Sequence, residues 1–166
     1  RANAFGLNTT AIIRDITKYK PNNKINFVSI KNIKQEIHKF DYLIIACPLN
    51  EETKDMINLK LIRNMKKNAI IINVARGPII NEADLYIALK NKLIRGAIID
   101  VWYNYPQNGS SKKLYPSKYP LHQLDNVTLS PHSSAWSHQL WDRRFKFICE
   151  NLENLYNNRR LKNIVS

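Results

Sequence analysis

An apolar run at residues 69–72 leads directly into the sequence NVARG at residues 73–77, and a helix-start pattern follows at Asn81. This stretch constrains the fold most, because a short buried strand, a turn and a helix form the repeating unit of a parallel α/β sheet. Ligands bind such sheets outside the carboxyl ends of the strands. Arg76 therefore either faces a ligand or is an ordinary surface arginine that follows a core strand.

Strand-like and helix-like segments alternate along the rest of the chain, and this alternation predicts a doubly wound parallel sheet with helices on both faces. β-branched and apolar runs predict further strands at residues 8–13, 41–46, 96–102 and 127–129. Apolar residues at helical spacing predict helices at residues 32–38, after Thr53, after Asn81 and at residues 137–157. Residues 19–26 are polar, contain Pro21, and predict a loop.

Three of these helices carry specific expectations. Asn81 is predicted to cap its helix, with Glu82 and Asp84 in the first turn, where carboxylates favour the helix dipole. Thr53 is predicted to cap a looser helix whose apolar residues are Met56, Leu59, Ile62 and Met65. The last helix is predicted to bury one apolar stripe, formed by Trp141, Phe145, Ile148, Leu152 and Leu155.

The predicted strand ends carry residues with chemical capability: Arg14, Cys47-Pro48, Arg76, Asp100 and His132. Because the carboxyl ends of parallel strands meet at one edge of a sheet, these residues are predicted to gather in one site. Asp100 ends an apolar strand, and a buried carboxylate is costly unless it has a partner or ligand. Together the strand ends favour the ligand interpretation of Arg76.

Composition narrows the class of protein. The 166 residues are 44% hydrophobic and carry 26 basic and 13 acidic side chains, a net charge of +13. The lysines are scattered among asparagines and isoleucines, which indicates a compositional bias and not a nucleic-acid surface. No apolar run approaches the roughly 20 residues that span a bilayer. The two cysteines fit a reducing compartment, so we expect a cytoplasmic protein with no membrane or nucleic-acid partner and no metal site.

Two stretches, NVARGPIINEADLYIALKNKLIRGAIIDVW at residues 73–102 and NVTLSPH at residues 126–132, resemble the D-isomer-specific 2-hydroxyacid dehydrogenases. Residues 48–69 look like the segment that precedes them in that family, and the similarity runs from residue 4 to residue 165. The resemblance implies a Rossmann-like sheet and an oxidoreductase that transfers a hydride between a nicotinamide cofactor and a small 2-hydroxy or 2-keto acid.

In that family a substrate-binding domain comes first, and the chain enters the nucleotide domain through a strand and a G-x-G-x-x-G turn. The four glycines here, at positions 6, 77, 96 and 109, cannot form that turn. The resemblance therefore implies an incomplete sheet, in which residues 1–132 are the remainder of an NAD(P)-binding domain. Residues 133–166 are then a C-terminal helix and tail that return toward a missing substrate domain. We expect this chain alone to be inactive and to bind dinucleotide weakly or not at all.

The resemblance also assigns roles to residues. Arg76 matches the arginine that binds the substrate carboxylate, and His132 matches the acid/base. The cofactor would be lined by Cys47, Pro48, Val74, Ala75 and Arg76, would bond to Asp100 through its carboxamide, and would border His132 and Ser134.

The choice between NAD and NADP falls at the end of the first predicted strand. Ile13 stands where the family has the acidic residue that holds an NAD ribose, and Arg14 follows it. Losing a carboxylate and gaining an arginine favours the 2′-phosphate of NADP. Asp15 follows directly, however, and a shift of one residue would restore a preference for NAD.

The sequence departs from the family at Tyr105, which precedes Pro106 and stands where the family has a glutamate that keeps the histidine charged. A tyrosine carries no negative charge at neutral pH, so His132 is expected to hold its proton less tightly than in typical members. Three interpretations follow: shifted acid/base chemistry, a reaction without proton transfer as in the formate dehydrogenase branch, or lost activity.

Two further expectations concern partners. The competing function is a nucleotide-sensing or catalytically inactive regulatory protein of the same fold. The family usually forms homodimers through the nucleotide domain, and the long connection at residues 103–125, rich in tyrosine, could cover the active site or a partner.

Overall fold

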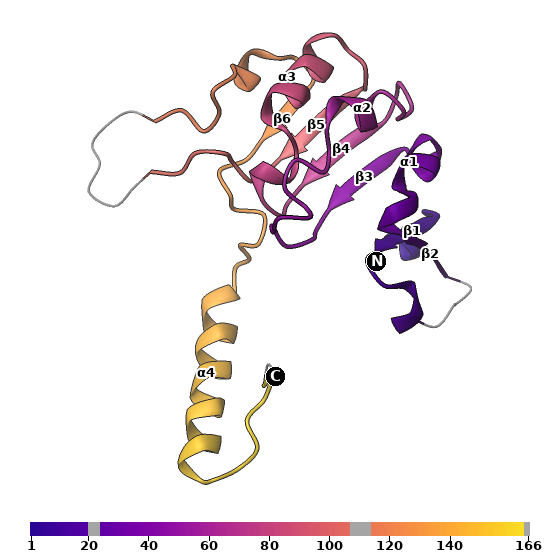
Figure 1. Ribbon diagram of the computed structural model, residues 1–166. Coiled ribbons are helices and arrows are strands. Elements are labelled where there is room, and N and C mark those ends of the chain that lie inside the picture. Colours follow the sequence, from indigo (N-terminus) through magenta and orange to yellow (C-terminus); the bar gives the residue numbers. More distant parts are fainter. Residues whose placement is uncertain (20–23, 107–113, 165–166) are drawn as a thin grey trace. The chain divides into compact units, whose positions relative to one another are not determined.

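The computed structural model describes residues 1–19, 24–106 and 114–164 (Figure 1). The chain separates into two compact units, Arg1–His132 and Ser133–Ser166. The first unit contains every strand found among the described residues, and the second contains one long helix. Within the described residues, no helix combines the length and the apolar character that crossing a membrane requires.

The strands of the first unit form two sheets, and all strand pairs are parallel. Strands β1 (Thr9–Ile13) and β2 (Ile25–Ser29) make a two-stranded sheet. Strands β3 (Tyr42–Ile45), β4 (Ile70–Asn73), β5 (Gly96–Ile99) and β6 (Val127–Leu129) make a second sheet in the order β3-β4-β5-β6. This confirms the predicted parallel α/β fold. Strand β2 was not predicted from the sequence. Its residues INFVS overlap the end of the loop predicted at residues 19–26, of which residues 20–23 lie outside the described residues, and among the described strands they pair with β1.

The division into two sheets can be compared with the strand order of a dinucleotide-binding sheet. The classic dinucleotide-binding sheet has the strand order 3-2-1-4-5-6. Here β2-β1 and β3-β4-β5-β6 are separate, so the break falls where that order places its first strand. The family resemblance predicted an incomplete sheet, and among the described residues no strand joins β1 to β3.

The helices of the first unit are short. Helix α1 (Ile33–Glu36) is flanked by the 3-10 turns Ile30–Asn32 and Ile37–Lys39, and helix α3 (Glu82–Lys90) is capped as predicted by Asn81, whose Oδ1 accepts a bond from the Asp84 N–H at 3.1 Å. The apolar faces of these elements meet the sheet in one core, whose most deeply buried members include Ile37, Ile62, Ile71, Ile80, Leu85 and Ile99.

The predicted cap at Thr53 is wrong. Helix α2 (Leu59–Ile62) begins six residues later and is capped by Asn58, whose Oδ1 accepts from the Leu61 N–H at 3.1 Å. Thr53 instead closes a polar turn with Asn50, because its hydroxyl can satisfy nearby backbone groups outside a helix.

In the second unit, helix α4 (Leu140–Tyr156) confirms the predicted helix, but its predicted burial is wrong. The five stripe residues Trp141, Phe145, Ile148, Leu152 and Leu155 are each more than half exposed. The periodicity of the stripe predicts an amphipathic helix correctly, whereas burial also requires a partner surface.

Candidate active site

The strand ends of the larger sheet lie in one row. Ile45 is in register with Asn73, Asn73 with Ile99, and Ile99 with Leu129. Cys47, Arg76, Asp100 and His132 follow these four positions by one to three residues. The sheet therefore presents four of the predicted strand-end residues at the same edge. Arg14 follows β1 and belongs to the smaller sheet.

The turn that carries Arg76 is built on Asn73. The Asn73 side chain is 1% exposed. Its Oδ1 accepts from the Ala75 N–H at 3.1 Å, and its Nδ2 donates to the Arg76 carbonyl at 2.9 Å. A buried amide that satisfies two backbone groups fixes the local chain path. Arg76 itself is exposed, and its Nη1 donates to the Ala75 carbonyl at 2.6 Å. Val74, next to it, is 40% exposed.

Gly77 brings this turn against the segment that follows β5. A Cβ atom at Gly77 would lie 2.4 Å from the carbonyl oxygen of Trp102, far inside van der Waals contact. The backbone approach is therefore possible only for glycine. As a result, the Arg76 turn and the Trp102 segment are packed directly against each other.

Asp100 has the partner that its burial requires. Its side chain is 2% exposed, and its Oδ1 accepts a bond from Ser130 Oγ at 2.6 Å. Trp102 Nε1 donates to the carbonyl of Ser130 at 3.1 Å. Two independent bonds thus join the end of β5 to the end of β6, immediately before His132.

His132 contacts Tyr105 directly. Tyr105 Oη lies 3.0 Å from His132 Nδ1, and the two rings are tilted with centroids 5.6 Å apart. The same Oη accepts a bond from the Trp102 backbone N–H at 3.0 Å. His132 has a φ of 57°, in the left-handed region that non-glycine residues seldom adopt. Strained backbone of this kind is concentrated at functional sites, where the surrounding structure holds it in place.

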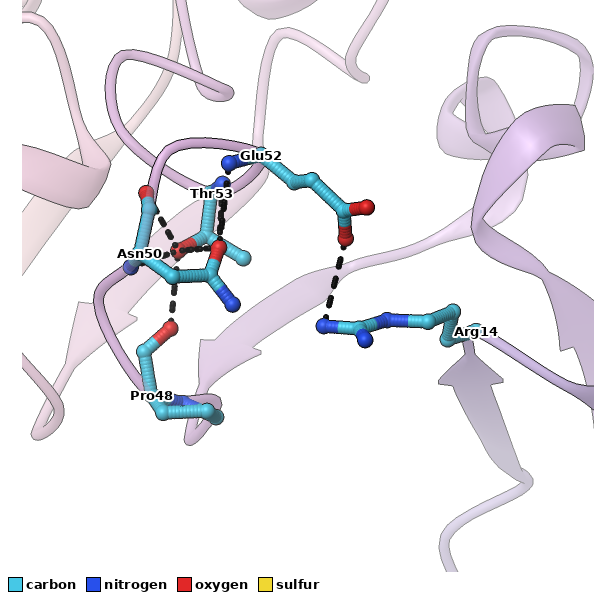
Figure 2. Close-up of polar contacts among 5 residues, drawn as sticks. All are labelled: Arg14, Pro48, Asn50, Glu52 and Thr53. Atoms are coloured by element: carbon cyan, nitrogen blue, oxygen red, sulfur yellow. Dashed lines mark hydrogen bonds and ion pairs between the residues drawn. The ribbon is translucent and has the colours of Figure 1, made fainter.

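Arg14 is paired with a carboxylate. Its Nη2 lies 3.2 Å from Glu52 Oε2, and both side chains are about two-thirds exposed (Figure 2). Figure 2 shows Glu52 reaching toward Arg14 from the turn after β3. That turn is held by Asn50 Oδ1, which accepts from the N–H groups of Glu52 and Thr53, and by the Thr53 hydroxyl, which donates to the Pro48 carbonyl at 2.8 Å.

The remaining predicted residues are placed as follows. Cys47 is half-buried, and desolvation raises the pKa of its thiol. Pro48 is exposed at the start of the Asn50 turn. Ala75 is buried under the Arg76 turn. Ser134 is exposed and belongs to the second unit.

The long connection after β5 is tied mainly to α3. Tyr103 Oη donates to the Ile80 carbonyl at 3.1 Å, and burial, followed by the charges of Glu82 and Asp55, raises the pKa of this phenol. The Lys118 N–H donates to Glu82 Oε1 at 2.7 Å, and Tyr119 stacks on Tyr86 with centroids 5.3 Å apart. Residues 107–113 of the predicted covering loop lie outside the described residues.

Three residues that shape this edge were not found from the sequence: Asn73, Ser130 and Glu52. The sequence does carry a signal for Asn73, because it is the single polar residue that ends the apolar run of β4. A buried amide at that position needs a backbone partner. Ser130 and Glu52 carry no local signal, because their contacts with Asp100 and Arg14 join segments 30 and 38 residues apart in the sequence.

Comparison with known proteins matches this arrangement to one family. Residues 1–134 match the family model described as D-isomer specific 2-hydroxyacid dehydrogenase, NAD binding domain. A glyoxylate reductase of Korarchaeum cryptofilum is 34% identical over 128 residues, which is 77% of this chain and 35% of that protein. A D-3-phosphoglycerate dehydrogenase of Methanocaldococcus jannaschii is 31% identical over 166 residues, 100% of this chain and 30% of that protein.

Structural comparison gives the same answer. The D-lactate dehydrogenase with NAD⁺ from Lactobacillus jensenii has a TM-score of 0.80 and 25% identity, over 99% of this chain and 50% of that one. Solved structures with this fold carry NADPH, NADP or NAD⁺. The chain spans about one third of the length of the curated relatives it matches. On the match of the family model to 134 of its 166 residues, the chain belongs to the D-isomer specific 2-hydroxyacid dehydrogenase family.

Proposed function

We propose that this chain is part of an oxidoreductase that transfers a hydride between a nicotinamide cofactor and a small 2-hydroxy or 2-keto acid. The observation that carries the proposal is the row of strand ends, which sets Arg76, Asp100 and His132 at one edge of the sheet. A protein that needed only a scaffold would have no use for these three side chains at that edge.

Arg76 binds the substrate carboxylate in this proposal. A guanidinium group presents a planar fork of donors that matches a carboxylate in bidentate geometry. The Asn73 bonds hold the backbone of Arg76, while its exposed side chain remains able to meet a ligand. Prearranged backbone reduces the ordering cost of binding.

His132 is the acid/base in this proposal. An imidazole changes its protonation state within the physiological pH range, which suits it to exchange a proton with the oxygen at the reacting carbon. Its φ of 57° and the contact between Nδ1 and Tyr105 hold the ring at the strand-end row. The ring nitrogen opposite that contact, Nε2, is the one assigned to the substrate.

The residues present suit the two ends of a dinucleotide. The buried Asp100 carboxylate at a strand end can accept from the carboxamide of a nicotinamide, and Arg14 can meet the adenosine ribose or its 2′-phosphate. Cys47, Pro48, Val74, Ala75 and Ser134 are assigned to the cofactor only by the family resemblance. When bound, the cofactor supplies or accepts the hydride. A weak preference for NADP rests on Arg14 and is opposed by Glu52, which competes for the same guanidinium.

A regulatory protein that senses nucleotides is the second candidate, and Tyr105 is the observation that favours it. A tyrosine in place of the family's glutamate removes the charge that would hold a proton on His132. Arg76 favours the enzyme function, because a nucleotide sensor has no need of a guanidinium at the substrate end of the site.

The test is a chimera that joins the amino-terminal part of the Korarchaeum cryptofilum glyoxylate reductase, including the glycine-rich turn that the family resemblance implies there, to this chain. The proposal expects NAD(P)H oxidation that depends on a 2-keto acid, measured across a panel of such acids. Arg76→Lys is expected to raise KM strongly, since a lysine cannot form the bidentate pair. Cofactor binding without turnover on any keto acid would favour the regulatory function.

The proposal has two further parts. The full-length protein is expected to be a homodimer, which sedimentation of the chimera tests, and a monomer at micromolar concentration would contradict this. A reducing, cytoplasmic setting is expected because a sequence with only two cysteines does not suggest a disulfide scaffold. Fluorescence microscopy of the tagged protein tests this, and secretion would contradict it.

A further inference from the structure

We infer that Tyr105 is a positioning residue that fixes the neutral form of His132 with its proton on Nε2, so that the site offers a hydrogen-bond donor to a carbonyl oxygen even when the ring is uncharged. The role toward a carbonyl oxygen rests on the proposed function. The tautomer of His132 rests only on hydrogen bonds within this chain.

The direction of each hydrogen bond follows from what each atom can do. The Trp102 backbone N–H can only donate, so Tyr105 Oη accepts that bond at 3.0 Å. The phenol has one proton of its own, and His132 Nδ1 lies 3.0 Å from the same oxygen. A neutral imidazole has one protonated and one unprotonated nitrogen. Among the described residues, Tyr105 Oη contacts only these two groups, so an unprotonated Nδ1 is the one protein acceptor for the phenol proton when the ring is neutral.

The tautomer follows directly. If Nδ1 accepts the phenol proton, the single proton of the neutral ring must be on Nε2. A charged ring has protons on both nitrogens, so Nε2 is a donor in that state as well. Nε2 of His132 is then a donor in both protonation states.

A carboxylate at position 105 would have the opposite effect. A glutamate can only accept when ionised, so it would draw the proton of the neutral ring to Nδ1 and leave a lone pair on Nε2. Such a ring could meet a carbonyl oxygen only while it is charged. With tyrosine at position 105, His132 can therefore donate a hydrogen bond to a 2-keto acid whether or not its ring is charged. The other ionisable groups at these strand ends, Asp100 and Arg76, are unchanged by the substitution.

Nitrogen NMR of the 166-residue chain, labelled with ¹⁵N at histidine, tests the tautomer without any need for activity. At a pH where the ring is neutral, the wild type is expected to show an unprotonated Nδ1 and a protonated Nε2 on His132. Tyr105→Glu is expected to show the reverse, and Tyr105→Phe a mixture of both tautomers. A His132→Gln variant assigns the signal.

Tyr115→Phe provides a matched control, because Tyr115 also lies against a histidine ring, that of His122, with centroids 6.3 Å apart. It is expected to leave the His132 signal unchanged. A protonated Nδ1 in the wild type, or equal tautomer populations in the wild type and Tyr105→Phe, would overturn the inference.

The chimera gives a second readout, inhibition by oxamate, a 2-keto acid analogue with an amide carbonyl. Above the pH at which the NMR signals show the ring to be neutral in each protein, inhibition is expected to weaken by about tenfold per pH unit in Tyr105→Glu, because the charged ring is its only Nε2 donor, and by less than about threefold in total with Tyr105. Equal weakening in both would overturn the inference. A chimera that turns over no keto acid but keeps the tautomer pattern would refute the proposed function alone.

Discussion

At the scale of single residues, the pairing of Arg14 with Glu52 bears on cofactor choice. Arg14 is the side chain expected to meet a 2′-phosphate, and the carboxylate of Glu52 already lies 3.2 Å from it. Exposed ion pairs of this kind contribute little to stability, but the negative charge remains next to the cation. A phosphate that approaches Arg14 therefore also approaches Glu52.

Glu52→Gln in the chimera is expected to raise the ratio of kcat/KM for NADPH over NADH by about two- to fivefold, the range that an exposed ion pair supports. Steady-state kinetics with both cofactors measures the ratio. Glu51→Gln is the matched control, because it removes the same charge from the neighbouring position, and it is expected to change the ratio less. An equal change of the ratio in both variants would show that net charge, and not the pairing of Glu52 with Arg14, is the cause.

Asn73 gives the second prediction at this scale. Asn73→Ala removes a buried amide, leaves the Ala75 N–H without its side-chain partner, and takes from the Arg76 carbonyl one of two bonds, the other being the bond from the Ile79 N–H at 3.3 Å. The free energy of unfolding is expected to fall by about 1–3 kcal/mol. Urea denaturation measures it, with Asn91→Ala as the control, since Asn91 is exposed and makes one side-chain bond, to the Ile87 carbonyl. Equal losses from the two variants would contradict the role assigned to the Asn73 bonds.

At the scale of elements, helix α4 shows what an apolar stripe does and does not predict. Phe145 is 61% exposed, whereas Leu89 on α3 is 1% exposed. Phe145→Ala is therefore expected to change the free energy of unfolding by less than about 0.5 kcal/mol, and Leu89→Ala to lower it by about 2–5 kcal/mol. Urea denaturation of the two variants measures both. A loss from Phe145→Ala as large as that from Leu89→Ala would show that the stripe is covered in solution.

The sequence predicted some of these elements and not others for physical reasons. Strands β3 to β6 were readable because buried parallel strands are short apolar runs, and the Asn81 cap was readable because capping is local. Strand β2 and the start of α2 were missed because the signals there are weak and polar turns can take the place of a helix start.

The candidate site was predicted to the same extent. The strand-end residues Arg76, Asp100 and His132 could be named from the sequence, since a parallel sheet brings strand ends together. The pairing of Tyr105 with His132 was implied only by the family resemblance, and the bond from Ser130 to Asp100 was not predicted, because both join segments that are distant in the sequence. No pattern of neighbouring residues encodes such contacts.

At the scale of the whole molecule, the residues proposed for the two ends of a dinucleotide lie on different sheets. The edge of the β3–β6 sheet carries Asp100 and His132, and the β1–β2 sheet carries Arg14. In a dinucleotide-binding sheet, the pyrophosphate binds at a glycine-rich turn and a helix N-terminus between those ends. The four glycines of this chain do not form that turn.

This chain alone is therefore expected to bind NADH or NADPH at least about a hundredfold more weakly than the chimera, because it lacks the backbone donors that hold the pyrophosphate. Isothermal titration calorimetry of both proteins with both cofactors measures the difference. Asp100→Asn in the chimera serves as the control, because it removes the residue proposed to bind the nicotinamide end. Its cofactor affinity is expected to fall by less than the difference between the chimera and this chain alone. Comparable affinity in the chain and the chimera would show that the strand-end residues hold the cofactor without the glycine-rich turn.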